Sequence, residues 1–272
     1  MPSTVLITGA SSGIGKATAH HFASQGWNVV ATMRSPDDAA DLASDHVLVN
    51  RLDLLDSESI DASVAAAIDR FGSIDVLVNN AGYGAYGPLE ATPMEVLRRQ
   101  FDVNFFGLVE LTKAVLPGMR TQRKGTIVNV SSVGGRFAFP FGTLYHGSKW
   151  AVEGLSEALH FEMRLFGGRV KIVEPGGVKT DFGSRSFVFT NDDSLGEYQP
   201  LVQAFVEAMS TMDTSSYQQP EEVAEIIWQA ATDGSDQLRY VSGEGAKATL
   251  GRRYSLEQDE AFVAGMRATY GL

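Results

Sequence analysis

The chain has 272 residues, 44% of them hydrophobic and 20% charged, which is the composition of a globular protein with a sizeable core and excludes a disordered chain. Its net charge of −11 disfavours binding to nucleic acids and anionic membranes. The lack of cysteine excludes disulfides, thiol nucleophiles, iron–sulfur ligation and the usual structural zinc sites.

Short runs rich in Val and Ile alternate with longer stretches of helical spacing. We expect seven strands, at residues 5–8, 27–33, 46–50, 74–79, 125–130, 170–174 and 238–241. Most of these runs are apolar at consecutive positions, which is typical of parallel strands covered on both faces. The helical patterns between them lie at 15–25, 57–71, 94–119, 143–166 and 220–233. The alternation predicts one α/β domain, a doubly wound parallel sheet of about seven strands with helices on both faces.

A strand-like run begins almost at Met1, with no targeting segment before it, and no apolar stretch approaches the ~20 residues that span a bilayer. We therefore expect a cytoplasmic protein, with residues 1–272 forming a single domain. Residues 182–216 interrupt the alternation after the sixth strand, where such folds place a substrate lid. That segment contains a helix-like run at 201–212, and residues 243–272 form a C-terminal extension.

The first strand runs directly into a glycine loop, Gly9-Ala10-Ser11-Ser12-Gly13-Ile14-Gly15, and a helix follows. Strand, glycine turn and helix N-terminus together form a site for a pyrophosphate. However, the spacing is not the usual Gly-x-Gly-x-x-Gly, so alternatives stay open. The loop also fits a tight turn without a ligand, an imperfect P-loop with Ala17 in place of Ser or Thr, or a hydrolase elbow around Ser11. The last would need an acid and a histidine downstream.

The end of the second strand favours a dinucleotide. A site selective for NAD places an acid ~20 residues beyond the glycines, whereas an arginine accommodates a 2′-phosphate. Here the strand ends in Arg34 and Ser35, without an acid. Arg34 as a phosphate-binding fork and Ser35 as a small donor favour NADP(H), with NAD(H) as the second choice. The alternative is a solvated arginine at a strand end.

Tyr145 and Lys149 are the first candidates for catalysis. At i and i+4 on a predicted helix they share a face. A nearby ammonium lowers the pKa of a tyrosine from its usual ~10 by ~1–3 units, towards neutrality. Such a tyrosine can transfer a proton to or from a carbonyl or carbinol oxygen. Ser132, at the end of the fifth strand, can hydrogen-bond the same oxygen.

With these motifs the chain, from Thr4 to about Tyr240, resembles the short-chain dehydrogenases/reductases, including hydroxysteroid- and retinol-type members and carbonyl reductases. The motifs that carry the resemblance appear in order: residues 8–15, Asp53 between Leu52 and Leu54, Asn79-Asn80-Ala81-Gly82, Asn104, Ser132, Tyr145-x3-Lys149 and residues 175–180. The resemblance implies a single-domain Rossmann-type fold and an NADP(H)-dependent oxidoreductase that interconverts a ketone or aldehyde and an alcohol.

The resemblance also implies the residues of the site. Asn104, Ser132, Tyr145 and Lys149 would form a catalytic tetrad, with Tyr145 as general acid and base. Lys149 would lower the pKa of Tyr145 and hold the nicotinamide ribose, Ser132 would orient the substrate oxygen, and Asn104 would hold a relay water. Asn104 also fits a purely structural role at a helix kink. The residues expected to bind the cofactor are Gly9, Ser11, Ser12, Gly13, Ile14, Gly15, Arg34, Ser35, Asp53, Leu54, Asn80, Ala81, Gly82, Tyr145, Lys149, Pro175, Gly176, Val178 and Thr180.

Aromatic residues near these motifs indicate an apolar substrate site. The residues expected to line it are Tyr83, Gly134, Phe139, Phe182 and Phe187. Such walls suit a bulky hydrophobic or aromatic carbonyl compound or alcohol. We expect no metal, because His20-His21 has no further ligand at suitable spacing. We expect a homodimer or homotetramer; the alternative function is a non-catalytic NADP(H) sensor of the same fold.

Overall fold

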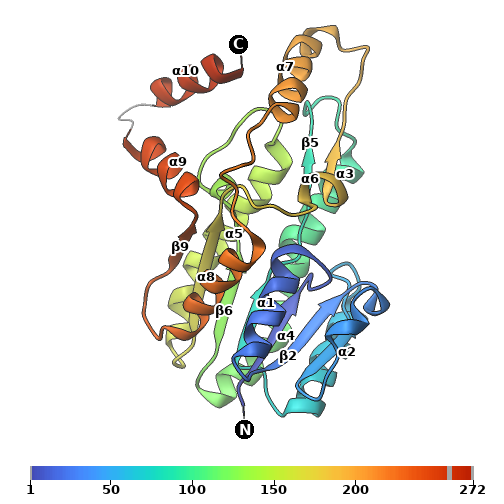
Figure 1. The fold of residues 1–272 in the computed structure, drawn as a ribbon, viewed down its shortest axis with the longest axis vertical. Coiled ribbons are helices and arrows are strands. Elements are labelled where there is room, and N and C mark those ends of the chain that lie inside the picture. Colours follow the sequence, from blue (N-terminus) through green and yellow to red (C-terminus); the bar gives the residue numbers. More distant parts are fainter. Residues whose placement is uncertain (1, 256–258, 271–272) are drawn as a thin grey trace.

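The computed structural model describes residues 2–255 and 259–270. Its centre is a parallel sheet of seven strands in the order β3-β2-β1-β4-β6-β7-β9 (Figure 1). The strands are β1 Thr4–Thr8, β2 Asn28–Met33, β3 Val47–Arg51, β4 Val76–Asn79, β6 Thr126–Val130, β7 Arg169–Pro175 and β9 Arg239–Ser242. The strand order reverses between β1 and β4, which confirms the doubly wound sheet expected from the sequence.

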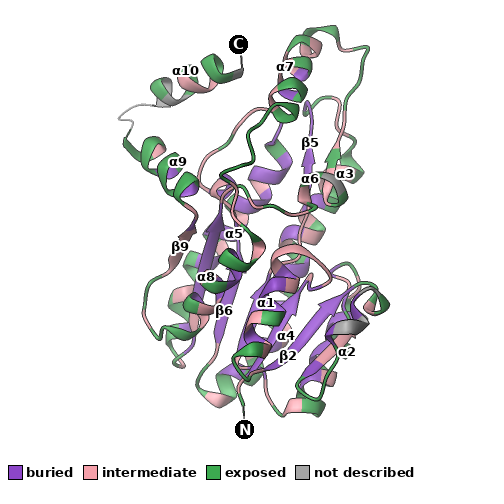
Figure 2. Cartoon of the chain, viewed as in Figure 1, coloured by how far each residue is buried: buried purple, intermediate pink, exposed green. Residues whose placement is uncertain are grey.

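Helices cover both faces of this sheet. Their bounds are α1 Gly13–Ser24, α2 Ser57–Phe71, α3 Met94–Phe101, α4 Gly107–Gln122, α5 Thr143–Arg164, α6 Phe182–Arg185, α7 Gln199–Ser210, α8 Pro220–Thr232, α9 Glu244–Ser255 and α10 Asp259–Tyr270. Side chains of α1 and α8 pack on one face, and those of α2, α4 and α5 pack on the other. The central strands are buried almost throughout, whereas α9 and α10 are largely exposed (Figure 2).

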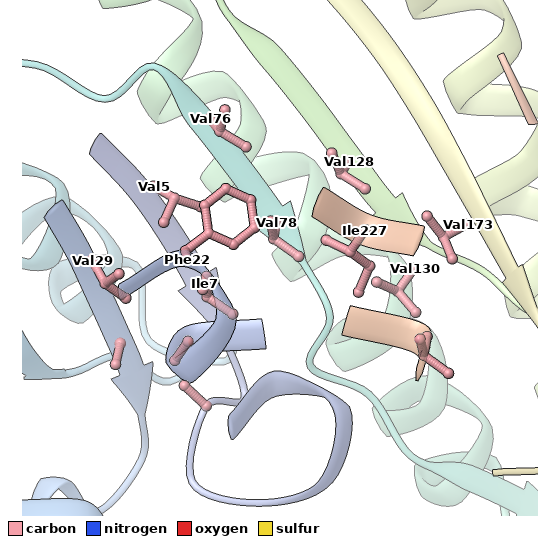
Figure 3. Packing of buried hydrophobic residues seen from close by; sticks show 14 of the residues in the cluster. Val5, Ile7, Phe22, Val29, Val76, Val78, Val128, Val130, Val173 and Ile227 are labelled. Atoms are coloured by element: carbon pink, nitrogen blue, oxygen red, sulfur yellow. The ribbon is translucent and has the colours of Figure 1, made fainter. Parts of the chain in front are cut away.

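The core follows from the alternation of side chains along each strand. On β1, Val5 and Ile7 belong to the cluster beneath α1 and α8, and Leu6 belongs to the cluster on the opposite face. Figure 3 shows the first cluster, where the ring of Phe22 from α1 lies among valines of the sheet. Phe22 is fully buried, which contributes about 1.5–3 kcal/mol to folding.

The helix expected at 94–119 is three segments. Between α3 and α4 lies a π-helical turn, η2 Asp102–Phe106. Directly after it, the backbone of Gly107 approaches Leu54 so closely that a Cβ would lie 2.5 Å from the Leu54 carbonyl oxygen. A π-turn inserts one residue without changing the apolar pattern much, so the periodicity did not indicate it.

A second sheet of two strands was not expected. It pairs β5 Gly84–Tyr86 with β8 Phe187–Phe189 in parallel. Each strand has three residues, which is too short to give a recognisable alternation. The pairing ties the segment after α6 to the loop that follows β4, at the end of the molecule that carries α7 (Figure 1). The C-terminal helix α10 contacts α7.

Candidate active site

A cleft of about 1080 Å³ lies at the carboxyl ends of β1, β4, β6 and β7. It is lined by nearly all residues that the sequence predicted for the cofactor and by all five predicted for the substrate. The predicted residues that do not line it are Gly15, Ser35 and Asn104. One continuous space therefore joins the glycine loop to Ser132, Tyr145 and Lys149.

The glycine loop has the backbone shape that a pyrophosphate requires. Gly9 and Gly13 have φ values of +70° and +52°, a region that residues with a Cβ rarely adopt. A Cβ on Gly15 would lie 2.2 Å from the carbonyl oxygen of Gly9, so only glycine allows α1 to start so close to the loop. Ser12 caps α1 without using its side chain, and the first turn carries no acidic residue. This N-terminus therefore suits a phosphate group.

Hydrogen bonds fix the part of the cleft wall that lies against the glycine loop. The hydroxyl oxygen of Thr8 accepts from the backbone N–H groups of Asn80 and Ala81, both at 3.0 Å. In return the Asn80 amide donates to the carbonyl oxygen of Thr8 at 2.8 Å. A Cβ on Gly13 would lie 3.1 Å from the methyl group of Thr180, so the glycine loop also contacts the turn after β7.

Arg34 and Asp53 lie towards the outer end of the cleft. Arg34 is exposed at the end of β2 and lines the cleft, whereas its neighbour Ser35 does not. Asp53 lines it as well, and its carboxylate accepts a hydrogen bond from the backbone of Leu55 at 3.0 Å. The cleft thus offers a guanidinium at the place where a 2′-phosphate was expected.

Tyr145 and Lys149 meet at the inner end of the cleft, on the buried face of α5. The Lys149 ammonium donates to the carbonyl oxygen of Val130 at 2.9 Å and lies 5.9 Å from the centre of the Tyr145 ring. Tyr145 is 8% exposed and Lys149 7%. The hydroxyl of Ser132 accepts a hydrogen bond from the backbone N–H of Gly134 at 3.0 Å, which places it at the edge of the same space.

The pKa of Tyr145 differs from the expectation. Burial raises it above its usual value, and a hydrogen bond with Ser132 opposes that shift only in part. Burial also lowers the pKa of Lys149 to about 8, against the opposing charge of Glu153. The reason is that a closed apolar wall disfavours both ions, the phenolate and the ammonium.

Asn104 sits in the π-turn and does not reach the cleft. Its side-chain oxygen accepts from the backbone N–H of Tyr83 at 3.0 Å, and its amide donates to the Tyr83 carbonyl at 2.9 Å and to the Ser148 hydroxyl at 3.2 Å. The side chain therefore braces the segment after β4 against α5. This geometry matches the structural role that the sequence left open, and the relay role stays a prediction.

Aromatic rings close the substrate end. Tyr86 stacks against Tyr145, with ring centres 5.5 Å apart, and against Phe187 at 5.0 Å. Phe205 on α7 is 2% exposed and stacks on Phe189 at 5.8 Å. Phe205 and Tyr86 both line the cleft, and Phe205 was not among the residues predicted for the substrate site. The spacing of Leu201, Val202 and Phe205 within the helix-like run was the signal for Phe205.

His146, next to Tyr145, supports the loop between Ser132 and α5. Its Nδ1 lies 2.8 Å from the Gly134 carbonyl, and its Nε2 accepts from the backbone N–H of Phe139 at 3.3 Å. These two bonds require the neutral ring with the proton on Nδ1, and burial indeed lowers the pKa of His146. A Cβ on Gly142 would lie 2.3 Å from the ring, so the loop backbone packs directly against this histidine.

The hydrolase interpretation of the glycine loop loses its geometric basis. No histidine is among the described residues that line the cleft with Ser11, so a hydrolase triad is not assembled there. Within residues 2–255 and 259–270 there is no group of three His, Cys, Asp or Glu side chains arranged to hold a metal. In the same part of the chain, no helix is long and apolar enough to cross a membrane.

Comparison with known proteins identifies the family. Residues 3–188 match the family model of the short chain dehydrogenases. The chain belongs to this family. It is 43% identical to an uncharacterized oxidoreductase of Schizosaccharomyces pombe, over 88% of this chain and all of the other. It is 38% identical to retinol dehydrogenase 8 of Bos taurus, over 83% of this chain and 77% of the other.

A solved structure shows the same fold. It is an alcohol dehydrogenase from the archaeon Thermococcus sibiricus, complexed with 5-hydroxy-NADP, with a TM-score of 0.74 and 25% identity over 89% of this chain and 97% of that one. The short-chain dehydrogenase is therefore an oxidoreductase with a Rossmann-type fold, as the sequence led us to expect.

Proposed function

We propose that this dehydrogenase interconverts a bulky hydrophobic ketone or aldehyde and its alcohol with NADP(H). The observation that carries the proposal is the single cleft that joins the glycine loop and Arg34 at one end to Ser132, Tyr145 and an aromatic wall at the other. When bound, the nicotinamide cofactor supplies or accepts the hydride.

The protein's own residues bind the cofactor, orient the substrate oxygen and transfer the proton. The loop from Gly9 to Gly15 would hold the pyrophosphate of the cofactor, and the turn from Pro175 to Thr180 would hold its nicotinamide end. Ser132 hydrogen-bonds the substrate oxygen, and Tyr145 donates a proton to it during reduction and accepts one during oxidation. Lys149 offsets the cost of the phenolate by its positive charge. The closed aromatic wall excludes water from the reacting centre.

The preference for NADP(H) rests on Arg34. An exposed guanidinium at the end of β2 can form charge-assisted hydrogen bonds to a 2′-phosphate, which contribute about 1.5–3 kcal/mol. We expect NADPH to bind roughly 10–100-fold more tightly than NADH, and Arg34→Ala to remove that difference while leaving NADH binding unchanged. Equal dissociation constants in the native protein, measured by fluorescence titration, would contradict this preference.

The substrate class rests on the wall built from Tyr86, Phe139, Phe182, Phe187 and Phe205. The name of one relative, retinol dehydrogenase 8, states a substrate that is itself a long apolar alcohol. A panel of aliphatic, aromatic and polycyclic ketones, followed by NADPH absorbance, tests the assignment. We expect kcat/KM to rise with apolar size. Tight NADPH binding without turnover of any ketone would instead favour a sensor.

We further propose a homo-oligomer that associates through α4 and α5. Trp150 and Phe161 are 52% and 68% exposed on one face of α5, and Leu165, directly after its last residue, is 83% exposed. Exposed apolar stripes of this kind mark protein contacts. Sedimentation equilibrium tests this proposal: a dimer or tetramer is expected in the native protein, and Phe161→Glu should shift it to monomer. A native monomer at micromolar concentration would exclude it.

A further inference from the structure

A network of buried charges lies next to the catalytic residues. It joins Glu153 on α5, Glu174 on β7, Arg239 on β9 and Arg136 in the loop between β6 and α5. Glu174 is fully buried and Glu153 is 5% exposed. Arg136 donates to Glu174 at 2.7 Å, and Arg239 donates to Glu153 at 3.0 Å and lies 3.4 Å from Glu174. Two carboxylates and two guanidinium groups thus share a region of low exposure.

Three members of the network are close in sequence to different parts of the site. Glu153 lies one helical turn beyond Lys149, so both side chains project from the same buried face of α5. Glu174 immediately precedes Pro175, where the turn at the nicotinamide end begins. Arg136 lies four residues after Ser132, in the loop that also contains Gly134. The network therefore ties together the three segments that carry the predicted chemistry.

The network is not explained as a contribution to stability. One oxygen of Glu153 and one of Glu174 are buried without a hydrogen-bond partner among the described residues. Such atoms are destabilising, and buried ion pairs seldom stabilise more than an apolar replacement would. Burial raises the pKa of Glu153 and the charge of Glu174 adds to that effect, whereas Ser131 and Arg239 both oppose it. A carboxylate held under these conditions points to an electrostatic role.

We propose that Glu153 is a positioning residue for Lys149: its carboxylate, which is paired with Arg239 and lies one helical turn beyond the lysine, keeps the lysine ammonium charged inside the buried site. This inference rests on the proposed function, in which only the charged lysine stabilises the Tyr145 phenolate. Burial brings the pKa of Lys149 down to about 8, and the charge of Glu153 works against that loss. Without this carboxylate, the lysine would become neutral close to physiological pH.

The charged and titratable groups around this pair can be named. Tyr145 and Glu157 lie on α5 itself, Glu174 approaches from β7, Arg239 from β9 and Arg136 from the loop before α5. Tyr254 of α9 in turn bonds to Arg136 at 2.6 Å.

Glu157 provides a matched control. It lies one turn beyond Glu153 and accepts from the other end of the same arginine, Arg239, at 2.6 Å. However, its side chain is 56% exposed, and it is not among the groups that shift the pKa of Lys149. Glu157→Gln therefore removes a carboxylate from the same partner, on the same helix, without removing the buried charge next to the lysine.

The decisive experiment is an NMR titration of the lysine side chains in the protein without added cofactor, with Lys149 assigned by Lys149→Met. We expect the pKa of Lys149 to fall by about one unit in Glu153→Gln. It should stay unchanged in Glu157→Gln and return towards the native value in Glu153→Asp. An unchanged Lys149 titration in a folded Glu153→Gln variant would overturn the proposal.

A measurement on the native protein keeps the proposal testable if Glu153→Gln does not fold. Carboxyl carbon shifts should show Glu153 ionised throughout the pH range in which Lys149 titrates; a Glu153 still protonated at pH 8 would overturn the inference. In kinetics, the alkaline limb of kcat for ketone reduction should move to lower pH by about one unit in Glu153→Gln only. Failure of the native protein to turn over any ketone would reject the proposed function and leave the NMR result unaffected.

Discussion

The two ends of the cleft are built on different principles. The cofactor end is made mainly of backbone from adjacent residues, with Gly9, Gly13 and Gly15 in positions that tolerate no Cβ or favour none. The substrate end is made of aromatic side chains from separate segments, among them Tyr86 on β5 and Phe205 on α7. One end is therefore fixed by local backbone geometry, whereas the other is an assembly of side chains that can be substituted individually.

The largest expected effect falls where the two ends meet. Tyr145→Phe removes only the hydroxyl that transfers the proton, so ketone reduction should fall roughly 10²–10⁴-fold. NADPH binding should remain within about twofold of native, because the ring and its packing are kept. Steady-state rates and fluorescence titration check the two halves of this prediction. Turnover close to native would remove Tyr145 from its role.

A substitution at the substrate end should weaken the use of bulky ketones without disturbing cofactor binding. Phe205→Ala opens a cavity in the aromatic wall and should lower the free energy of unfolding by about 3–5 kcal/mol. It should also raise KM for bulky ketones, with little change for small ones. The dissociation constant of NADPH, measured at a temperature where the variant is folded, should stay native. A matching loss of NADPH affinity would mean that the two ends are not separable.

A substitution in the glycine loop should disturb the cofactor end without disturbing the substrate end. In Gly15→Ala the added Cβ would lie 2.2 Å from the Gly9 carbonyl oxygen, so the loop must move, at a cost of about 1–3 kcal/mol. NADPH should then bind roughly 10–100-fold more weakly. Gly154→Ala is a suitable control, because nothing lies within 4 Å of its added Cβ. Unaltered binding in Gly15→Ala would show that the loop does not hold the cofactor.

The smallest expected effect is the contribution of His146 to the pH dependence of folding stability. Burial lowers the pKa of His146 below the ordinary value of 6.5, so the unfolded chain takes up the proton first as pH falls. The stability that the neutral ring provides is full above pH 6.5 and declines as pH drops towards the folded-state pKa. His146→Leu should flatten this part of the stability curve, measured by urea unfolding from pH 7.5 to 5. A native curve with the same slope as the variant would contradict the account.

The sheet and the strand–loop–helix geometry of the glycine loop could be predicted because their signals are local. Consecutive apolar residues indicate a buried strand, and strand, glycine turn and helix N-terminus follow one another between Thr4 and Lys16. Ser132, Tyr145 and Lys149 were found in the same way, from spacing on one helix and one strand end. For such features, sequence neighbours are also neighbours in space.

The rest depended on contacts between distant segments. The π-turn at Asn104 fits the space beside Tyr83 and Ser148, which no local pattern reveals. The pairing of β5 with β8 joins residues about a hundred positions apart through three-residue strands. The pKa of Tyr145 likewise depends on how completely the wall closes over it. Composition indicated an aromatic pocket there, but could not say which rings would meet.

The proposed hydride transfer is tested most directly by following an isotopic label from the cofactor to the product alcohol. Native protein is incubated with NADPH deuterated at C4 of the nicotinamide and with the best ketone from the panel, and the product alcohol is analysed by mass spectrometry and NMR. We expect one deuterium on the carbinol carbon, at a rate that Tyr145→Phe reduces roughly 10²–10⁴-fold. Tight binding of NADPH with no deuterium transferred to any carbonyl compound would contradict this expectation and favour a cofactor sensor.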